Sequence, residues 1–267
     1  MNKKILSAVI SAFALYAAYE NIFAFKIRRE KLGNGLKIFQ ISDIHKKRFG
    51  ENNRKIAETA KKESPDLIFL TGDTVSRRQK NFTPEKILLE NLCKIAPVYV
   101  TLGNHEGDLG DKYLKKFIGT VKNSGAVLLR NEIKTVEIKG RKFNICGLEL
   151  PQTVYKKNGR YKNLDIPTLD DINSLVGRCP QGETLLLAHN PLFGELYSSW
   201  GADYTFSGHV HGGIINIMGR GLLSPERKFF PKYSKGIYEI NGKKLLVSAG
   251  IGKLRLFNPS EAVVYEL

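Results

Sequence analysis

Short apolar runs that end abruptly in polar loops dominate the first half of the chain. Residues 36–41, 67–70 and 98–102 are runs of this kind, and segments with apolar residues at helical spacing, 52–63 and 83–94, lie between them. Strand, helix and strand in this order are typical of parallel pairing. The pattern therefore predicts an α/β fold in which parallel strands alternate with helices.

The second half of the chain is richer in strands. We expect a helix over 111–123, a polar and basic loop over 151–167 that is a candidate to overhang a site, and a short helix over 169–176. Strands are predicted over 126–129, 133–138, 143–148, 184–188, 204–206, 236–240, 245–249 and 262–266. Two halves of this kind indicate a core of two sheets flanked by helices.

The N-terminus has a different pattern. Two lysines precede an apolar run from Ile5 to Phe25, which is interrupted near its end by Glu20 and Asn21, and a basic stretch follows to Lys31. Because about 20 apolar residues are needed to cross a bilayer, the length of this run favours an uncleaved membrane anchor.

We therefore expect two parts, a membrane anchor or signal segment with a basic stalk over 1–31 and one folded domain over 32–267. A cleaved signal peptide is the first alternative, because Ala12-Phe13-Ala14 is a permissible cleavage site. An amphipathic helix lying on the membrane surface is the second, although its polar face is small. Basic residues flank the apolar run on both sides, so the positive-inside rule leaves the side of the domain open.

The composition, 42% hydrophobic and 25% charged, is that of a folded protein. The three cysteines are far apart, which indicates buried thiols and argues against a disulfide framework or a thiolate metal site. Lys and Arg outnumber Asp and Glu by 42 to 26, a formal net charge of +16. This charge favours anionic partners such as phosphate groups, nucleic acid or anionic lipid, unless it serves solubility alone.

All five histidines lie in loops that directly follow predicted strands. They are His45, His105, His189, His209 and His211. Histidines with scattered structural roles would also occur in helices and ordinary turns. Since ligands bind at the carboxyl ends of strands in α/β sheets, the concentration predicts one polar site built from several strand ends.

Asp43, Asp73 and Asn104 occupy the same kind of loop. Each of them alone is equally typical of a turn. Together with the histidines they form a set of hard and borderline ligands that suits Mn, Fe, Zn or Co. Two cations about 3.5 to 4 Å apart need a shared anionic ligand, and an aspartate bridges them through its two oxygens.

Five motifs in this order resemble the signature of the calcineurin-like metallophosphoesterases. They are Asp43-x-His45, Gly72-Asp73, Gly103-Asn104-His105-Glu106, His189 and Gly208-His209-x-His211. The resemblance covers about residues 36–267 and implies a metallophosphoesterase domain folded as a four-layer αββα sandwich, here preceded by one N-terminal hydrophobic helix. It also implies two divalent metal ions as cofactors.

The resemblance assigns a role to each of these residues. Asp43, His45 and His211 would hold the first metal, Asn104, His189 and His209 the second, and Asp73 would bridge them. His105 would stay off the metals and protonate the leaving oxygen or stabilise charge on the phosphoryl group. Ala188 stands before His189 where many relatives have glycine, and every metal position matches.

The hydrophobic N-terminus and the ending over 248–259 are similar to the membrane-associated bacterial branch of the family. That branch includes phosphodiesterases and pyrophosphatases of UDP-2,3-diacylglucosamine. The resemblance therefore implies a membrane-associated enzyme. It also favours an extracytoplasmic domain, against the basic residues downstream of the apolar run.

The expected function is metal-dependent hydrolysis of a phosphoester or phosphoanhydride. A lipid-linked substrate is preferred because basic and aromatic residues interleave over 220–235, although a surface loop packed on the core has the same pattern. The candidate substrate contacts are Arg227, Lys228, Phe229, Phe230 and Arg255. The alternatives are a nuclease or soluble-nucleotide phosphodiesterase, for which no nucleic-acid-binding module is visible, and an inactive membrane-bound scaffold, which would have lost ligands.

Overall fold

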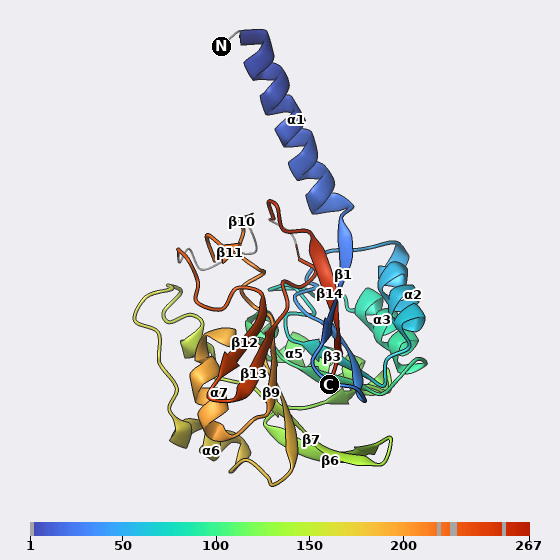
Figure 1. Ribbon diagram of the computed structural model, residues 1–267, viewed down its shortest axis with the longest axis vertical. Coiled ribbons are helices and arrows are strands. Elements are labelled where there is room, and N and C mark those ends of the chain that lie inside the picture. The colour runs from blue at the N-terminus through green and yellow to red at the C-terminus, as the bar shows by residue number, and fades with distance from the viewer. Residues whose placement is uncertain (1–2, 218–219, 225–228, 253–254) are drawn as a thin grey trace.

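In the computed structural model, two six-stranded sheets stack face to face and helices cover their outer faces (Figure 1). The structure describes residues 3–217, 220–224, 229–252 and 255–267. This is the αββα arrangement that the sequence predicts. Helix α1 (Lys3–Ile22) projects from the domain, and its N-terminal end lies far from the sheets (Figure 1).

The first sheet has the strand order β1-β14-β2-β3-β4-β5, and its central strands run parallel. Its strand β14 is antiparallel to β2, and β1 joins β14 in parallel at the edge. The bounds are β1 (Phe25–Lys31), β2 (Lys37–Ile41), β3 (Leu67–Thr71), β4 (Val98–Thr101), β5 (Val127–Leu128) and β14 (Ser260–Glu266).

The second sheet has the order β12-β13-β9-β8-β7-β6, with parallel strands at its centre and antiparallel strands at both edges. The bounds are β6 (Glu132–Ile138), β7 (Arg141–Leu148), β8 (Glu183–Ala188), β9 (Tyr204–Ser207), β12 (Gly236–Ile240) and β13 (Lys243–Val247). A separate pair is formed by β10 (Asn216–Ile217) and β11 (Arg220–Gly221).

Three hydrophobic layers hold this sandwich together. Strand β3 contributes to two of these layers. Leu67 and Phe69 point into the core between the sheets, and Ile68 and Leu70 point into the core beneath the helices. The first sheet is covered by α2 (Arg54–Glu63), α3 (Thr83–Cys93) and α5 (Asp111–Asn123), and the second by α6 (Leu169–Val176) and α7 (Gly194–Trp200). Short helical segments are η1 (Glu51–Asn53), α4 (Asn104–Gly107), η2 (Gln152–Val154) and η3 (Pro191–Phe193). A strand buried on both faces reads as a continuous apolar run, which is why β2, β3 and β4 are visible in the sequence.

The basic stretch before residue 32 was expected as a stalk, and this expectation is wrong. Residues 25–31 form β1, which pairs with β14 over its whole length. Its alternate residues Phe25 and Ile27 pack on the core, while Arg28 forms ion pairs with Glu30 and Glu261. The folded domain therefore begins at about Phe25.

Helix α1 is long and apolar enough over Lys4–Ile22 to cross a membrane, by length and composition. Signal sequences pass the same test. Almost none of this span is buried against the domain, so α1 does not contribute to the protein core.

Candidate metal and catalytic centre

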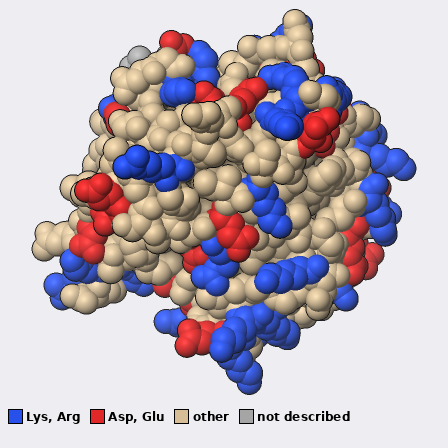
Figure 2. Space-filling view, turned by 90° about the horizontal axis from the view of Figure 1, so that it is seen from below, with Lys and Arg blue, Asp and Glu red and all other residues tan. Residues whose placement is uncertain are grey.

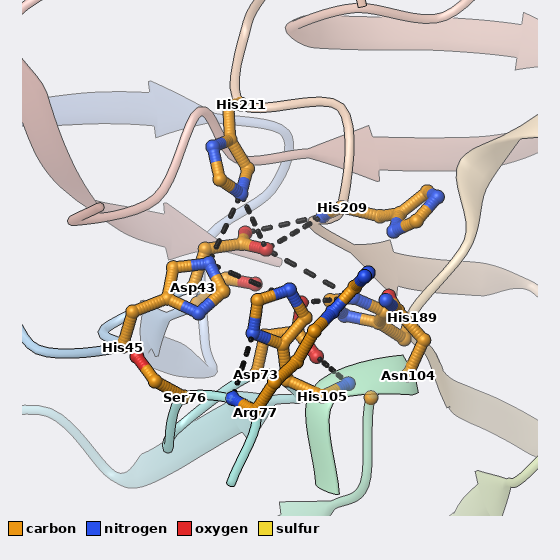
Figure 3. Close-up of polar contacts among 12 residues, drawn as sticks. Asp43, His45, Asp73, Ser76, Arg77, Asn104, His105, His189, His209 and His211 are labelled. Carbon is orange, nitrogen blue, oxygen red and sulfur yellow. Dashed lines mark hydrogen bonds and ion pairs between the residues drawn. The ribbon is translucent and has the colours of Figure 1, made fainter. Parts of the chain in front are cut away.

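Loops that follow five strands of both sheets converge on one site (Figure 3). The residues after β2 and β3 face those after β8 and β9, and α4 begins directly after β4. The structure thereby brings together every residue predicted as a metal ligand or catalytic group: Asp43, His45, Asp73, Asn104, His105, His189, His209 and His211.

One group of possible metal ligands consists of Asp43, His45 and His211, whose donor atoms all lie within 4.8 Å of one another. The Nε2 atoms of His45 and His211 are 3.2 Å apart, and His211 Nε2 lies 3.3 Å from Asp43 Oδ1. Two imidazole nitrogens and one carboxylate oxygen therefore lie close enough together to bind the same cation.

A second group consists of Asp73, His189 and His209, and its donor atoms fall within the same limit. His189 Nε2 lies 3.3 Å from Asp73 Oδ2, which is also 3.9 Å from His45 Nε2 in the first group. Asp73 therefore lies between the two groups. Asn104 adds a buried Oδ1 atom that accepts no hydrogen bond from any residue that the structure describes.

His105 also lies close to this centre. Its Nε2 atom is 3.8 Å from Asp73 Oδ2, and its donor atoms form a third group with those of His45 and Asp73. The backbone N–H of Arg77 donates to His105 Nδ1 at 3.3 Å. An Nδ1 atom that accepts a hydrogen bond leaves the ring proton on Nε2, which faces the centre.

Hydrogen bonds to the backbone orient the other ligands. His189 Nδ1 lies 2.7 Å from the carbonyl oxygen of Thr71, so Nδ1 donates and Nε2 is left for the centre. The backbone N–H of His209 donates to both oxygens of Asp43 at 3.1 Å. Partners of this kind fix both the tautomer and the direction of a metal ligand.

Glu106 is a structural residue of the site that the sequence did not identify, although it belongs to the third motif. Its carboxylate accepts from the backbone N–H groups of Asp73 at 3.0 Å, Gly103 at 2.8 Å and Val75 at 3.1 Å. These bonds tie the loop after β3 to the loop after β4. Burial and the charge of Asp73 raise the pKa of Glu106 to about 8.

The charges of the site depend on one another. Burial lowers the pKa of His45 to about 4 and that of His105 to about 3, so both rings are neutral at neutral pH. Burial also opposes ionisation of Asp73 and protonation of His189. Their mutual attraction outweighs it, which lowers the pKa of Asp73 and raises that of His189 to about 10. A divalent cation would take the place of that proton, since ligand histidines bind in the neutral form.

The backbone is strained at the same positions. Asp43, His45, Asp73, His209 and His211 all have positive φ, with values of 52°, 52°, 52°, 68° and 55°. Non-glycine residues adopt this conformation rarely, and each instance costs on the order of 1–3 kcal/mol. Strain concentrated on five predicted ligands indicates that the fold maintains their placement for function.

Glycines in the motifs permit the close approach of the two halves. A Cβ atom at Gly72, which has φ of 89°, would lie 2.5 Å from His189 Nδ1. One at Gly208 would collide with the carboxylate of Asp43 and the hydroxyl of Ser42. Both glycines are therefore required where loops from different sheets meet.

A pocket of about 460 Å³ opens over this centre. Besides the residues above, its walls include Lys46, Arg77, Tyr155, Tyr161 and Ile214. The 151–167 loop, expected to overhang a site, supplies the two tyrosines. Lys46 and Arg77 carry no direct signal in the sequence, although both closely follow ligand motifs.

The candidate substrate contacts are placed differently from one another. Arg227 and Lys228 lie outside the described residues, whereas Phe229 and Phe230 are 75% and 71% exposed. Arg255 was expected on the same rim but is only 2% exposed, so it lies beneath the surface. Its guanidinium donates to backbone carbonyls, including that of His211 at 3.3 Å, a role that residue type alone does not reveal.

The positive charge is not gathered on the face opposite α1. There, Lys and Arg side chains form several small groups with Asp and Glu among them (Figure 2). Ion pairs such as Arg141–Glu183 and Lys139–Asp66 neutralise part of the basic excess. Among the residues that the structure describes, this face carries no broad basic track of the kind that nucleic acid requires (Figure 2).

Imidazole, carboxylate and amide oxygen are the donors that borderline divalent cations prefer, and two neighbouring groups with Asp73 between them suit a pair of such cations. With an open pocket above them, the fold and site define a metal-dependent phosphoesterase. The model of the calcineurin-like phosphoesterase family matches residues 36–213, and the chain belongs to this family.

Relatives and solved structures agree with this assignment. An uncharacterised metallophosphoesterase of Aquifex aeolicus is 27% identical, with 97% of this chain and 96% of the relative covered. The UDP-2,3-diacylglucosamine pyrophosphatase LpxG of Chlamydia muridarum is 24% identical, with 86% and 83% covered. The structure of Haemophilus influenzae NAD nucleotidase has the same fold, with a TM-score of 0.53, 17% identity, and 80% of this chain and 45% of that one covered.

Proposed function

We propose that the chain hydrolyses a phosphoester or phosphoanhydride with two divalent metal ions, and that its substrate is lipid-linked and reached at a membrane surface. The observation that carries the hydrolase proposal is the pair of three-ligand groups on either side of Asp73. Asp43, His45 and His211 would hold one ion, and Asn104, His189 and His209 the other. Bound cations of this kind lower the pKa of water and neutralise charge that develops on a phosphoryl group.

His105 supplies a proton donor in this proposal. Its ring is neutral at neutral pH, and the Arg77 N–H at Nδ1 keeps the proton on Nε2. Asp73 holds the residue in place by accepting from the His105 backbone N–H at 2.8 Å. As the neutral ring, His105 can stabilise charge on the phosphoryl group by donating a hydrogen bond from Nε2; to protonate a leaving oxygen it would first take up a proton and act as the imidazolium. Lys46 and Arg77 on the pocket wall are suited to further phosphate oxygens.

The lipid-linked part of the proposal rests on a set of exposed apolar residues that we call the apolar rim: Ile217, Phe229, Phe230 and Phe257. The ring of Phe257 lies against Phe13 and Tyr16 of α1, with centroids 6.1 and 5.7 Å apart. The rim is therefore continuous with the helix that is suited to a membrane.

The rim also reaches the pocket. The neighbour of Phe257, Leu256, forms backbone hydrogen bonds with Ile214 and Asn216, and Ile214 lines the pocket wall. The segment that carries Phe257 is thus joined by hydrogen bonds to the wall of the pocket. The similarity to LpxG, whose name gives a diacylated sugar nucleotide as substrate, supports the same substrate class.

Hydrolysis should depend on metal. We expect the full-length chain in detergent to hydrolyse an aryl phosphodiester when Mn²⁺ is present, to lose that activity with a chelator, and to regain it when Mn²⁺ is restored. The reason is that bound cations lower the pKa of water and neutralise the charge that develops on the phosphoryl group. Product release is followed by absorbance, with single-stranded DNA and a lipid pyrophosphate assayed beside it. Absence of hydrolysis with Mn²⁺, Fe²⁺, Zn²⁺ and Co²⁺ alike would favour the alternative that the chain is a catalytically inactive scaffold.

Replacing both Phe229 and Phe230 with serine should impair lipid hydrolysis selectively. Each buried aromatic side chain contributes roughly 1.5–3 kcal/mol, so KM for a lipid pyrophosphate in mixed micelles should rise at least about tenfold. Turnover of a soluble aryl phosphodiester should stay unchanged. The matched control is Ile166→Ser, since Ile166 is 81% exposed but belongs to the 151–167 loop. Equal behaviour of the double variant and wild type on both substrates would remove the rim from substrate binding.

A further inference from the structure

The last turn of α1 is fastened to the domain by its two polar residues. The carboxylate of Glu20 is 2% exposed and accepts from the backbone N–H of Phe257 at 2.7 Å. Asn21 forms a two-point pair with the backbone of Arg255: its Nδ2 donates to the carbonyl oxygen at 2.6 Å, and its Oδ1 accepts from the N–H at 2.9 Å. The polar break in the apolar run is therefore where α1 contacts the catalytic domain.

This junction also touches the loop after β2. The ammonium of Lys47, which is buried, donates to the backbone carbonyl of Asn21. Lys47 comes two residues after the predicted ligand His45. The end of α1 is thus in contact with two segments that border the metal centre, one near residue 47 and one at 255–257.

The side chain of Arg255 extends from the junction toward the metal centre. Its Nε donates to the carbonyl of Gly252 at 2.6 Å, its Nη2 to that of Ala249, and its Nη1 to that of His211 at 3.3 Å. Burial lowers the pKa of this guanidinium to about 10, so it stays charged at neutral pH. A buried cation that holds three carbonyls fixes the loops to which they belong.

These loops carry or contact the group of possible ligands formed by Asp43, His45 and His211. His211 itself lies on one of them. The turn held at Ala249 and Gly252 packs against the other two members, since a Cβ atom at Gly250 would lie 2.7 Å from Asp43 Oδ2 and one at Gly252 would lie 2.9 Å from His45 Cδ2. In the second group, His189 is oriented instead by the carbonyl of Thr71.

We propose that Asn21 and Arg255 are positioning residues that couple the seating of α1 to the metal site formed by Asp43, His45 and His211. The helix is then part of the metal site as well as a tether, and a change in its seating changes the affinity of one metal ion. This inference rests on the proposed function only in taking that group as a metal site.

The experiment is a Co²⁺ titration of the full-length chain in detergent micelles, followed by visible absorbance and calorimetry. Asn21→Leu removes the paired amide, Arg255→Lys keeps the charge but loses the planar set of donors, and Leu15→Ala, at an exposed position of α1, is the control. We expect one of two binding steps to weaken about 10- to 100-fold in both junction variants, the range typical of residues that support metal ligands. The other step and the control should match wild type.

Binding in the junction variants that matches wild type at both steps would overturn the coupling, as would a parallel loss at both steps. Thermal unfolding measured on the same samples identifies a variant that has lost its fold. Should Arg255→Lys do so, Asn21→Leu decides, because Asn21 lies at the domain surface. A wild-type chain that binds no second Co²⁺ ion would instead contradict the proposed two-metal function, so the two failures are distinguishable.

Discussion

Replacing Asp73 with asparagine is expected to abolish turnover and to reduce the metal content of the purified chain from two ions to one or none. Asp73 Oδ2 lies 3.3 Å from His189 Nε2 and 3.9 Å from His45 Nε2, so its carboxylate faces both ligand groups. An amide offers one neutral oxygen in place of two that share a negative charge. Metal ions contribute several kcal/mol to phosphoryl transfer, so the rate should fall by orders of magnitude.

Metal analysis and steady-state kinetics on the same preparation test this expectation. The Asp170→Asn variant, altered at an exposed position of α6, controls for loss of charge alone. A chain with Asn at 73 that retained two ions and full turnover would show that Asp73 does not bridge them. Loss of a single ion with the other retained would identify which group depends most on the shared carboxylate.

The sequence was sufficient to predict the centre because of the geometry of parallel strands. The strands β2, β3, β4, β8 and β9 are largely buried, and each leads into a loop with a ligand motif. Parallel strands place such loops at one edge of a sheet. Residues that are distant in sequence, such as Asp43 and His211, therefore meet without any local signal that pairs them.

The features that the sequence did not reveal depend on partners distant in the chain. Strand β1 looked like a basic stalk because its charged residues conceal an alternating pattern, and its pairing partner β14 lies at the other end of the chain. Arg255 looked like a surface cation because the carbonyls that receive its hydrogen bonds carry no sequence signature. Glu106 likewise acts only through backbone N–H groups. Residue type identifies candidate metal ligands, but it does not identify the side chains that support them.

His105→Ala should lose rate while keeping both metal ions. Its Nε2 faces the centre, its Nδ1 accepts from Arg77, and the proposed ligand from the same loop is Oδ1 of Asn104, which is unpaired among the described residues. General acid assistance contributes about 10²- to 10⁴-fold in rate, so kcat on a phosphodiester with a poor leaving group should fall by that factor. With a nitrophenolate leaving group the loss should be much smaller, because that oxygen departs without protonation.

The comparison that decides the role of His105 is between leaving groups at fixed metal content. A slope of log kcat against leaving-group pKa that is steeper in His105→Ala than in wild type identifies a proton donor, because the variant then depends on the leaving group alone. His105→Gln retains an N–H donor but cannot act as a general acid. Its rate should therefore exceed that of His105→Ala if part of the loss comes from charge stabilisation. Depleted metal in either variant would instead make His105 a ligand, in keeping with its place beside His45 and Asp73.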